Sequence, residues 1–184
     1  QVCPMRGLIL TALLACSAIL LPAGANAATA ADLDAKVKAA LDRLYTEVKG
    51  SEAVTAKAAG YLVFPGVVKA GFVIAGEGGE GALRTRGTTR GYYTIFSGSI
   101  GFQAGGQKRD IIIAFMDPAS LRKFEESEGW KAGVDGSITL IEQGVGANLD
   151  VTKIKEPIVA FVVGQKGLMA GVSVDGSKIT RVKK

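Results

Sequence analysis

Apolar residues recur with helical spacing between residues 29 and 49. The apolar positions are Leu33, Val37, Ala40, Leu41 and Leu44. This spacing of i, i+4, i+7, i+8 and i+11 places all of them on one face of an α-helix. We therefore predict a helix over residues 29–49 that packs through this stripe, with Lys36 and Lys38 on its polar side.

Two shorter helices are indicated by the residues at their ends. Residues 51–59 begin at Ser51, a favourable N-cap, and stop before Gly60. A third helix is predicted to start at Asp117 and Pro118, because Asp is favoured at the N-cap and Pro at the first helical position.

The rest of the chain alternates short apolar segments with glycine-rich stretches, which is typical of β-strands and turns. In residues 61–83 we predict two strands separated by a break at Pro65 and Gly66, and a turn at residues 76–81 (GEGGEG). Further strands are predicted at residues 82–86, 90–96, 99–107, 110–116, 137–142, 147–152, 158–163, 168–174 and 178–182, the last after a hairpin turn at Asp175 and Gly176. The strands between residues 82 and 116 are predicted to form an antiparallel meander.

These elements predict an α+β fold. It is a single domain with a mainly antiparallel, curved or barrel-like sheet packed with about three helices. Residues 76–81 also match the glycine spacing of a dinucleotide-binding loop. Strand-like residues follow that segment instead of a helix, and Glu77 and Glu80 would repel a phosphate, so the pattern favours a simple turn.

Residues 1–27 have the pattern of a secretory leader. Met5 and Arg6 precede an apolar run at residues 8–21, and Ala25-Asn26-Ala27 is a typical cleavage site. We expect the mature domain to span residues 28–184 and the protein to be exported to the periplasm, the outer membrane or the medium. Cys16 follows Leu13-Leu14-Ala15, which resembles a bacterial lipobox, so acylation of Cys16 is the alternative to cleavage after Ala27.

Composition disfavours several kinds of chemistry. The chain has 184 residues and no histidine, and its two cysteines, Cys3 and Cys16, lie in the leader. No cofactor or metal site is predicted. The acidic residues Glu77, Glu80, Asp110, Asp135 and Asp150 are expected to be solvated in turns, although an enzyme that works through converging carboxylates remains an alternative.

Basic residues supply the candidate binding site. The formal net charge is +5, which favours an anionic partner. The candidate membrane-binding residues are Lys36, Lys38, Lys69, Arg84, Arg86, Arg90, Lys108 and Arg109. Several lie at strand ends or turns and could converge on one face; the alternative is that they are scattered charges that only aid solubility. Nucleic acid is disfavoured, because export separates the protein from it and no basic–aromatic RNA-binding motif is present.

Six aromatic residues complete the set of candidates: Tyr92, Tyr93, Phe96, Phe102, Trp130 and Phe161. We expect most of them in the core and one or two at a membrane interface.

Several segments resemble the SYLF domain family, also called the Ysc84 family. They are FPGVVKAGF and GEGAL in the central stretch, Tyr92-Tyr93, SIGFQAGGQKRD, FEESEGWKAGVDGS and KGLMAGVSVDGSKITR. The resemblance covers roughly residues 31–181 and implies a lipid-binding module. We therefore expect a non-catalytic protein of the bacterial envelope that binds anionic phospholipid membranes. The alternative is an outer-membrane lipoprotein with a structural or protein-interaction role.

Overall fold

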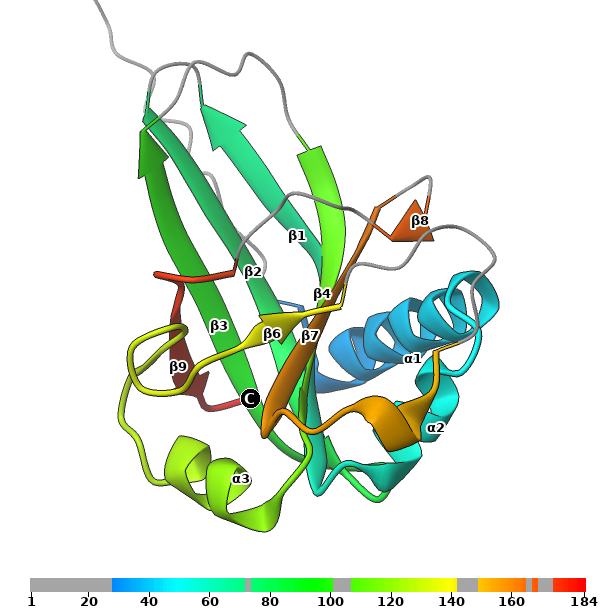
Figure 1. The fold of residues 1–184 in the computed structure, drawn as a ribbon. Coiled ribbons are helices and arrows are strands. Elements are labelled where there is room, and N and C mark those ends of the chain that lie inside the picture. The colour runs from blue at the N-terminus through cyan, green and yellow to red at the C-terminus, as the bar shows by residue number, and fades with distance from the viewer. Residues whose placement is uncertain (1–27, 72–73, 101–106, 142–148, 165–166, 169–173) are drawn as a thin grey trace, which may run out of the picture.

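The structure, a computed structural model, describes residues 28–71, 74–100, 107–141, 149–164, 167–168 and 174–184. Figure 1 shows its elements, which in chain order are α1 (Ala30–Glu47), α2 (Ser51–Lys57), β1 (Gly60–Gly71), β2 (Ile74–Thr85), β3 (Thr88–Ile100), β4 (Gln107–Phe115), α3 (Pro118–Glu125), β5 (Trp130–Lys131), β6 (Thr139–Leu140), the 3-10 helix η1 (Val151–Lys153), β7 (Ile158–Gly164), β8 (Gly167–Leu168) and β9 (Lys178–Val182).

One curled sheet organises the fold (Figure 1). In the part of the chain that the structure describes, its strand order is β5-β9-β3-β2-β1-β4-β7-β6, and β8 also pairs with β7, off this path. The pairs are antiparallel except β6–β7, which is parallel. Together with the three α-helices, this confirms the predicted α+β class and the mainly antiparallel, curved sheet.

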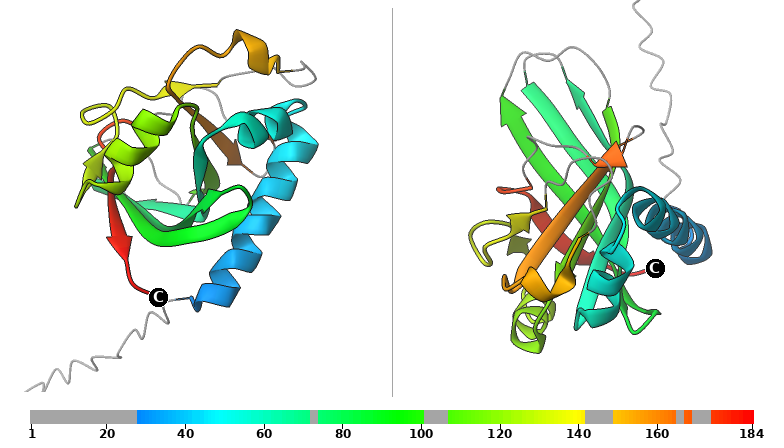
Figure 2. Two further views of the ribbon diagram at one scale, coloured as in Figure 1. Left: turned by 90° about the horizontal axis from the view of Figure 1, so that it is seen from below. Right: turned by 45° about the vertical axis from the view of Figure 1, so that its right-hand side comes forward.

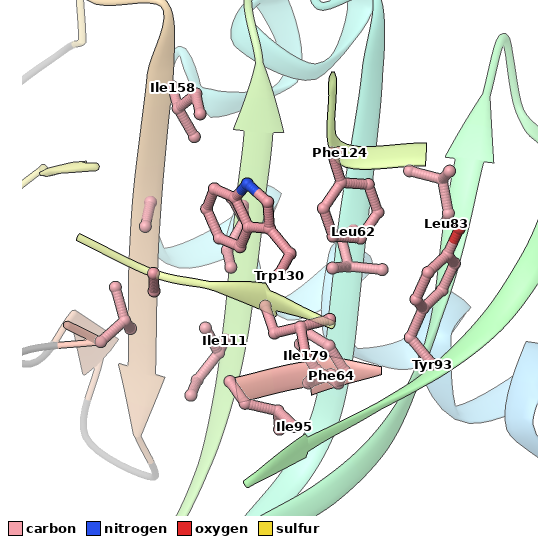
Figure 3. Close-up of a cluster of buried hydrophobic side chains, with 14 of the residues drawn as sticks. Leu62, Phe64, Leu83, Tyr93, Ile95, Ile111, Phe124, Trp130, Ile158 and Ile179 are labelled. Atoms are coloured by element: carbon pink, nitrogen blue, oxygen red, sulfur yellow. The ribbon is translucent and has the colours of Figure 1, made fainter. Parts of the chain in front are cut away.

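The concave side of the sheet holds the aromatic core (Figure 3). Phe124 of α3 lies 4.9 Å from Phe115 of β4, between ring centroids, and 5.6 Å from Trp130 of β5. Tyr93 of β3 lies 5.0 Å from Phe124 on its other side. Phe124 therefore anchors α3 and β5 to the inside of the curl, and Tyr93 and Trp130 are core residues as predicted.

The convex side is covered in part by α1 (Figure 2). The five apolar residues predicted to form its stripe are buried. Its N-cap is Thr29, whose side chain accepts a hydrogen bond from the Asp32 N–H at 3.2 Å. Asp34 fixes the helix to the sheet, because it accepts hydrogen bonds from Thr89 (2.9 Å) and Tyr92 (3.1 Å) and lies 3.7 Å from Arg84.

The central glycine-rich stretch differs from the prediction. Pro65 and Gly66 lie within the single strand β1, and residues 76–81 lie within β2, paired with both β1 and β3. The glycines allow these strands to approach closely: a Cβ on Gly81 would lie 2.3 Å from the carbonyl oxygen of Val63 and 2.5 Å from the ring of Phe64. Residues 76–81 were predicted to be a turn because glycine is favoured both in turns and in strands whose backbones approach closely.

The predicted connectivity is also corrected. β1, β2 and β3 form a meander, but β4 pairs with β1 instead of β3. β9 follows the expected turn at Asp175 and Gly176, yet it pairs with β3 and β5. Residues 149–152, the described part of a predicted strand, contain the start of η1 and no strand. Local sequence patterns indicate where the strands lie, whereas the order of the strands in the sheet depends on long-range packing.

Candidate functional site

A β-bulge in β1 shapes the candidate site. The register of β1 against β4 shifts between Phe64 and Val67. Pro65 has no N–H to donate to a neighbouring strand, and Gly66 has a φ of 63°, in the left-handed region. Because the bulge adds a residue to β1, the side chains that follow it point to the opposite faces of the sheet from those that simple alternation would give. As a result Val67 is fully buried on the concave side, and Val68, which is 48% exposed, faces the convex side.

An open pocket of about 490 Å³ lies where α1 crosses this bulge. The lining residues are Lys36, Ala39, Ala40 and Arg43 of α1, Pro65 and Gly66 of β1, and Lys108, Arg109 and Asp110 of β4. The pocket therefore joins segments that are far apart in the sequence, and we call it the α1–β4 pocket.

Asp110 organises the floor of the α1–β4 pocket. Its side chain is 5% exposed and accepts a hydrogen bond from the Gly66 N–H at 2.7 Å, which satisfies a backbone donor at the bulge. It also accepts from Arg43, whose side chain is 45% exposed. Asp110 was predicted to be solvated in a turn; that prediction is wrong, because the carboxylate is needed to pair with these two donors.

Two lysines give the α1–β4 pocket its excess positive charge. Lys36 and Lys108 are exposed, and neither forms an ion pair within the described residues. Lys108 passes over the bulge: a Cβ on Gly66 would lie 2.6 Å from its Cε atom. With Arg43 counted against Asp110, two lysine charges remain unbalanced at the mouth of the pocket.

An exposed apolar row lies beside the lysines on the convex face. Val68 pairs with Lys108 on one side and with Gly78 on the other, and Gly78 pairs with Phe96. Phe96 is 64% exposed, and a Cβ on Gly78 would lie 4.0 Å from its ring. We call the α1–β4 pocket and this row together the convex patch, because they form one surface of cations next to apolar side chains.

A buried ion pair lies behind the convex patch, on the concave side. Arg109 donates from Nε to Oε1 of Glu77 at 2.7 Å and makes a second hydrogen bond to the other carboxylate oxygen. The two side chains are 5% and 8% exposed. Glu77 was predicted to be solvated; the structure corrects this, because a strand residue that faces inward needs a partner for its charge. Arg109 is correspondingly not a surface cation.

The remaining candidate cations do not converge with Lys36 and Lys108. Lys38 pairs with Asp42 along α1, at 2.6 Å. Lys69 is half-buried in β1, opposite Glu77 in register. Arg84 is engaged with Asp34, as described above.

Arg86 and Arg90 lie at the far end of β2 and β3. The candidate basic residues therefore do not all share one face, because residues adjacent in a strand point to opposite sides of the sheet and the strands are long.

The candidate binding residues left out Arg43 and Val68. Arg43 carried a signal that could have been used, since it lies seven residues after Lys36 and hence on the same side of the helix. The sequence held no comparable signal for Val68, because the face of the sheet to which its side chain points depends on the bulge. Phe96 was expected in the core, with an interfacial place allowed for one or two aromatic residues; its exposure follows from the burial of Tyr93 and Ile95 on the opposite face.

Metal binding and membrane-spanning helices concern the rest of the fold. The described residues hold no group of three or more acidic, His or Cys side chains that could bind a metal ion. None of the helices among them is long and apolar enough to cross a membrane. Cys16 and Phe102 lie outside the described residues.

Comparison with known proteins identifies the family. Residues 96–184 match the Ysc84 family model, which is described as "Las17-binding protein actin regulator". The chain belongs to the Ysc84 (SYLF) family. It is 30% identical over 137 residues to the SH3 domain-containing YSC84-like protein 1 of Xenopus laevis. That match covers 71% of this chain and 40% of the frog protein, so the chain spans about two fifths of the length of this Ysc84 relative.

Proposed function

We propose that this Ysc84 domain binds anionic phospholipid membranes, without catalysis, through the convex patch. The observation that carries the proposal is the placement of exposed Phe96 and Val68 beside Lys108 and the α1–β4 pocket. An exposed ring is favourable at a membrane interface, and lysines next to it are attracted to anionic headgroups. The positive charge of the convex patch complements a negatively charged bilayer, and we therefore propose a membrane as its partner.

The size of the effect can be estimated from the surface. Each basic residue close to an anionic bilayer contributes about 1 kcal/mol. Lys36 and Lys108 therefore contribute about 2 kcal/mol, and Arg43 is offset by Asp110. Burial of the exposed part of Phe96 adds about 1–2 kcal/mol, since full burial of such a side chain is worth roughly 1.5–3 kcal/mol. Charge and apolar contact are thus of similar weight, and both are required for stable binding.

Vesicle co-sedimentation tests the proposal. The chain is mixed with vesicles of phosphatidylcholine alone, or of phosphatidylcholine with phosphatidylglycerol, at low and high salt. We expect binding to the anionic vesicles that weakens as salt rises, because the charge contribution is screened over about 10 Å at 0.1 M salt. Equal failure on both kinds of vesicle contradicts membrane binding and leaves a protein partner as the remaining role.

Matched variants locate the surface. Phe96→Ser should reduce binding about five- to thirtyfold, and the pair Lys36→Gln with Lys108→Gln about thirtyfold, which correspond to the contributions of about 1–2 and about 2 kcal/mol. Val134→Ser is the apolar control, because Val134 is 75% exposed and lies outside the convex patch. If Val134→Ser weakens binding as much as Phe96→Ser does, the convex patch is not the membrane contact.

The orientation of Phe96 gives a second test. Trp130, the single tryptophan, is already buried in the concave core. In a Phe96→Trp variant, a blue shift of emission on anionic vesicles is therefore expected to arise from the new indole. No shift in a variant that still co-sediments would place the contact elsewhere.

Export to the bacterial envelope is a further part of this proposal. It is supported by the leader-like residues 1–27 and by the lipobox-like sequence that ends in Cys16. Mass spectrometry of the mature protein tests it: a new N-terminus at Ala28 indicates cleavage of a signal peptide, and an acylated Cys16 indicates the lipoprotein alternative. An intact N-terminus in an exporting host would contradict both.

A further inference from the structure

A second basic groove lies at the opposite end of the long strands. It has a volume of about 740 Å³ and is formed by the end of α2, the β2–β3 turn and the start of α3. Its polar and charged lining residues are Lys57, Thr85, Arg86, Thr88 and Arg90. We call it the turn groove. No acidic side chain lines it, and its three cations form no ion pair within the part of the chain that the structure describes.

Irregular backbone directs both arginines into the turn groove. Arg86 has a φ of 50°, a left-handed conformation that a residue other than glycine, asparagine or aspartate rarely adopts. Arg90 is the extra residue of a β-bulge: Leu83 pairs with Gly91 and Arg84 pairs with Thr89, so Arg90 has no partner on β2. A bulge reorients a side chain, and a strained turn residue marks a place where position matters.

The turn groove is far from the convex patch. Phe96 and Thr88 are eight residues apart on β3, which corresponds to about 26 Å at the usual rise per residue. α1 covers part of the convex face of the sheet (Figure 2) and supplies residues to the convex patch, so the sheet cannot lie flat on a bilayer. When the domain binds through Phe96 and Lys108, the strand ends that carry these residues tilt toward the membrane. The turn groove, at the opposite ends of the strands, then points away from the membrane.

We propose that the turn groove binds a second anionic membrane, so that one domain bridges two phospholipid surfaces. This inference rests on the proposed function of the convex patch. The turn groove has the charge that phosphate headgroups require, and its threonine hydroxyls at positions 85 and 88 are able to donate to phosphate oxygens. Having no exposed apolar row like Val68 and Phe96, it binds the second surface through charge alone. Bridging is therefore more sensitive to salt than the first attachment.

Vesicle clustering measured by light scattering, in parallel with co-sedimentation, tests the inference. The full chain is added to vesicles of phosphatidylcholine and phosphatidylglycerol. The wild type should co-sediment and also cluster the vesicles, and added salt should reverse clustering before it reverses binding. Binding without clustering overturns the second site and leaves the proposed function intact. Absence of binding overturns both.

The variant Arg86→Asn with Arg90→Gln separates the two surfaces. Asparagine tolerates the left-handed conformation of Arg86, so the turn is preserved while two charges are removed. Removing two cations from the turn groove should weaken its contact with the second membrane about thirtyfold and abolish clustering, while co-sedimentation is retained. Clustering that persists in this variant overturns the inference.

Two further variants complete the test. Lys57→Gln leaves the turn untouched and should give intermediate clustering. Lys131→Gln with Lys183→Gln removes the same net charge from exposed residues outside both surfaces, and should cluster vesicles like the wild type. Equal loss of clustering in this control would show that net charge, and not the turn groove, bridges the membranes, and would overturn the inference.

Discussion

Loss of Glu77 should destabilise this domain far more than loss of an exposed acidic residue. In a Glu77→Gln variant, Arg109 keeps its charge in a site where the two side chains are 5% and 8% exposed. Removing one partner of such a pair costs about 3–5 kcal/mol, because the other charge is left without compensation. For a domain of this size, that loss lowers the melting temperature by on the order of 10 °C.

A surface pair within the same chain provides the control. Lys38 and Asp42 are separated by 2.6 Å, much like a buried pair, but their side chains are 72% and 58% exposed. An exposed pair of this spacing in a helix is worth about 0.3–0.5 kcal/mol. Asp42→Asn should therefore change stability by less than about 0.5 kcal/mol, although a distance criterion alone would rank both pairs as equal.

Urea unfolding followed by the fluorescence of Trp130 measures these differences. Trp130 is 1% exposed in the concave core and is the single tryptophan, so its emission reports the loss of that core. A double variant, Glu77→Leu with Arg109→Met, isolates the cause. It leaves no buried charge unpaired and should be within about 1–2 kcal/mol of the wild type.

The reasoning would be refuted by either of two results. One is a Glu77→Gln variant that loses less than about 1 kcal/mol, close to the control pair. The other is a double variant, Glu77→Leu with Arg109→Met, whose loss of stability equals the sum of the losses of the Glu77→Leu and Arg109→Met single variants, since additivity means that the charges do not interact. In both cases the pair would behave as a solvated one.

Three more changes test other parts of the fold. Gly81→Ala should lose more than about 2 kcal/mol of stability to overpacking, whereas Gly98→Ala, where a Cβ would meet nothing within 4 Å, should be tolerated; urea midpoints compare the two. Asp117→Ala should lose about 1 kcal/mol at neutral pH. The hydrogen bonds from Ser120 and Ala119 lower the pKa of the Asp117 carboxyl below its usual 3.8. The stabilisation by Asp117 is therefore fully present above pH 3.8 and is lost as the pH falls through the lowered pKa. Unfolding measured at a series of acidic pH values should show this loss. Arg86→Gly should raise the melting temperature, because it relieves about 1 kcal/mol of left-handed strain.

Much of the fold follows from local signals in the sequence. The stripe from Leu33 to Leu44 gave α1, and Asp117 with Pro118 gave the start of α3. Strand order was not accessible in this way: β4 pairs with β1 because both are apolar on two faces, and no local signal distinguishes that partner from β3. The glycines of β2 have the composition of a turn, and only the closeness of β1 shows that they are needed in a strand.

The site was less predictable than the fold, because its residues depend on backbone irregularities. Lys108 and Arg109 are adjacent in sequence and were treated as one cluster, but one reaches the convex surface and the other forms a buried pair with Glu77. The bulge at Pro65 and Gly66 reverses the phase of β1, and the bulge at Arg90 directs a second cation toward the turn groove. Clustering of charge along a chain therefore does not establish clustering in space. In this family member two sets of basic residues form separate surfaces: Lys36 and Lys108 in the convex patch, and Lys57, Arg86 and Arg90 in the turn groove. A charge-reversal scan of these five residues should resolve into two groups of variants: one that loses attachment to vesicles and one that loses only their clustering. A single group that loses both together would mean that the two surfaces act as one.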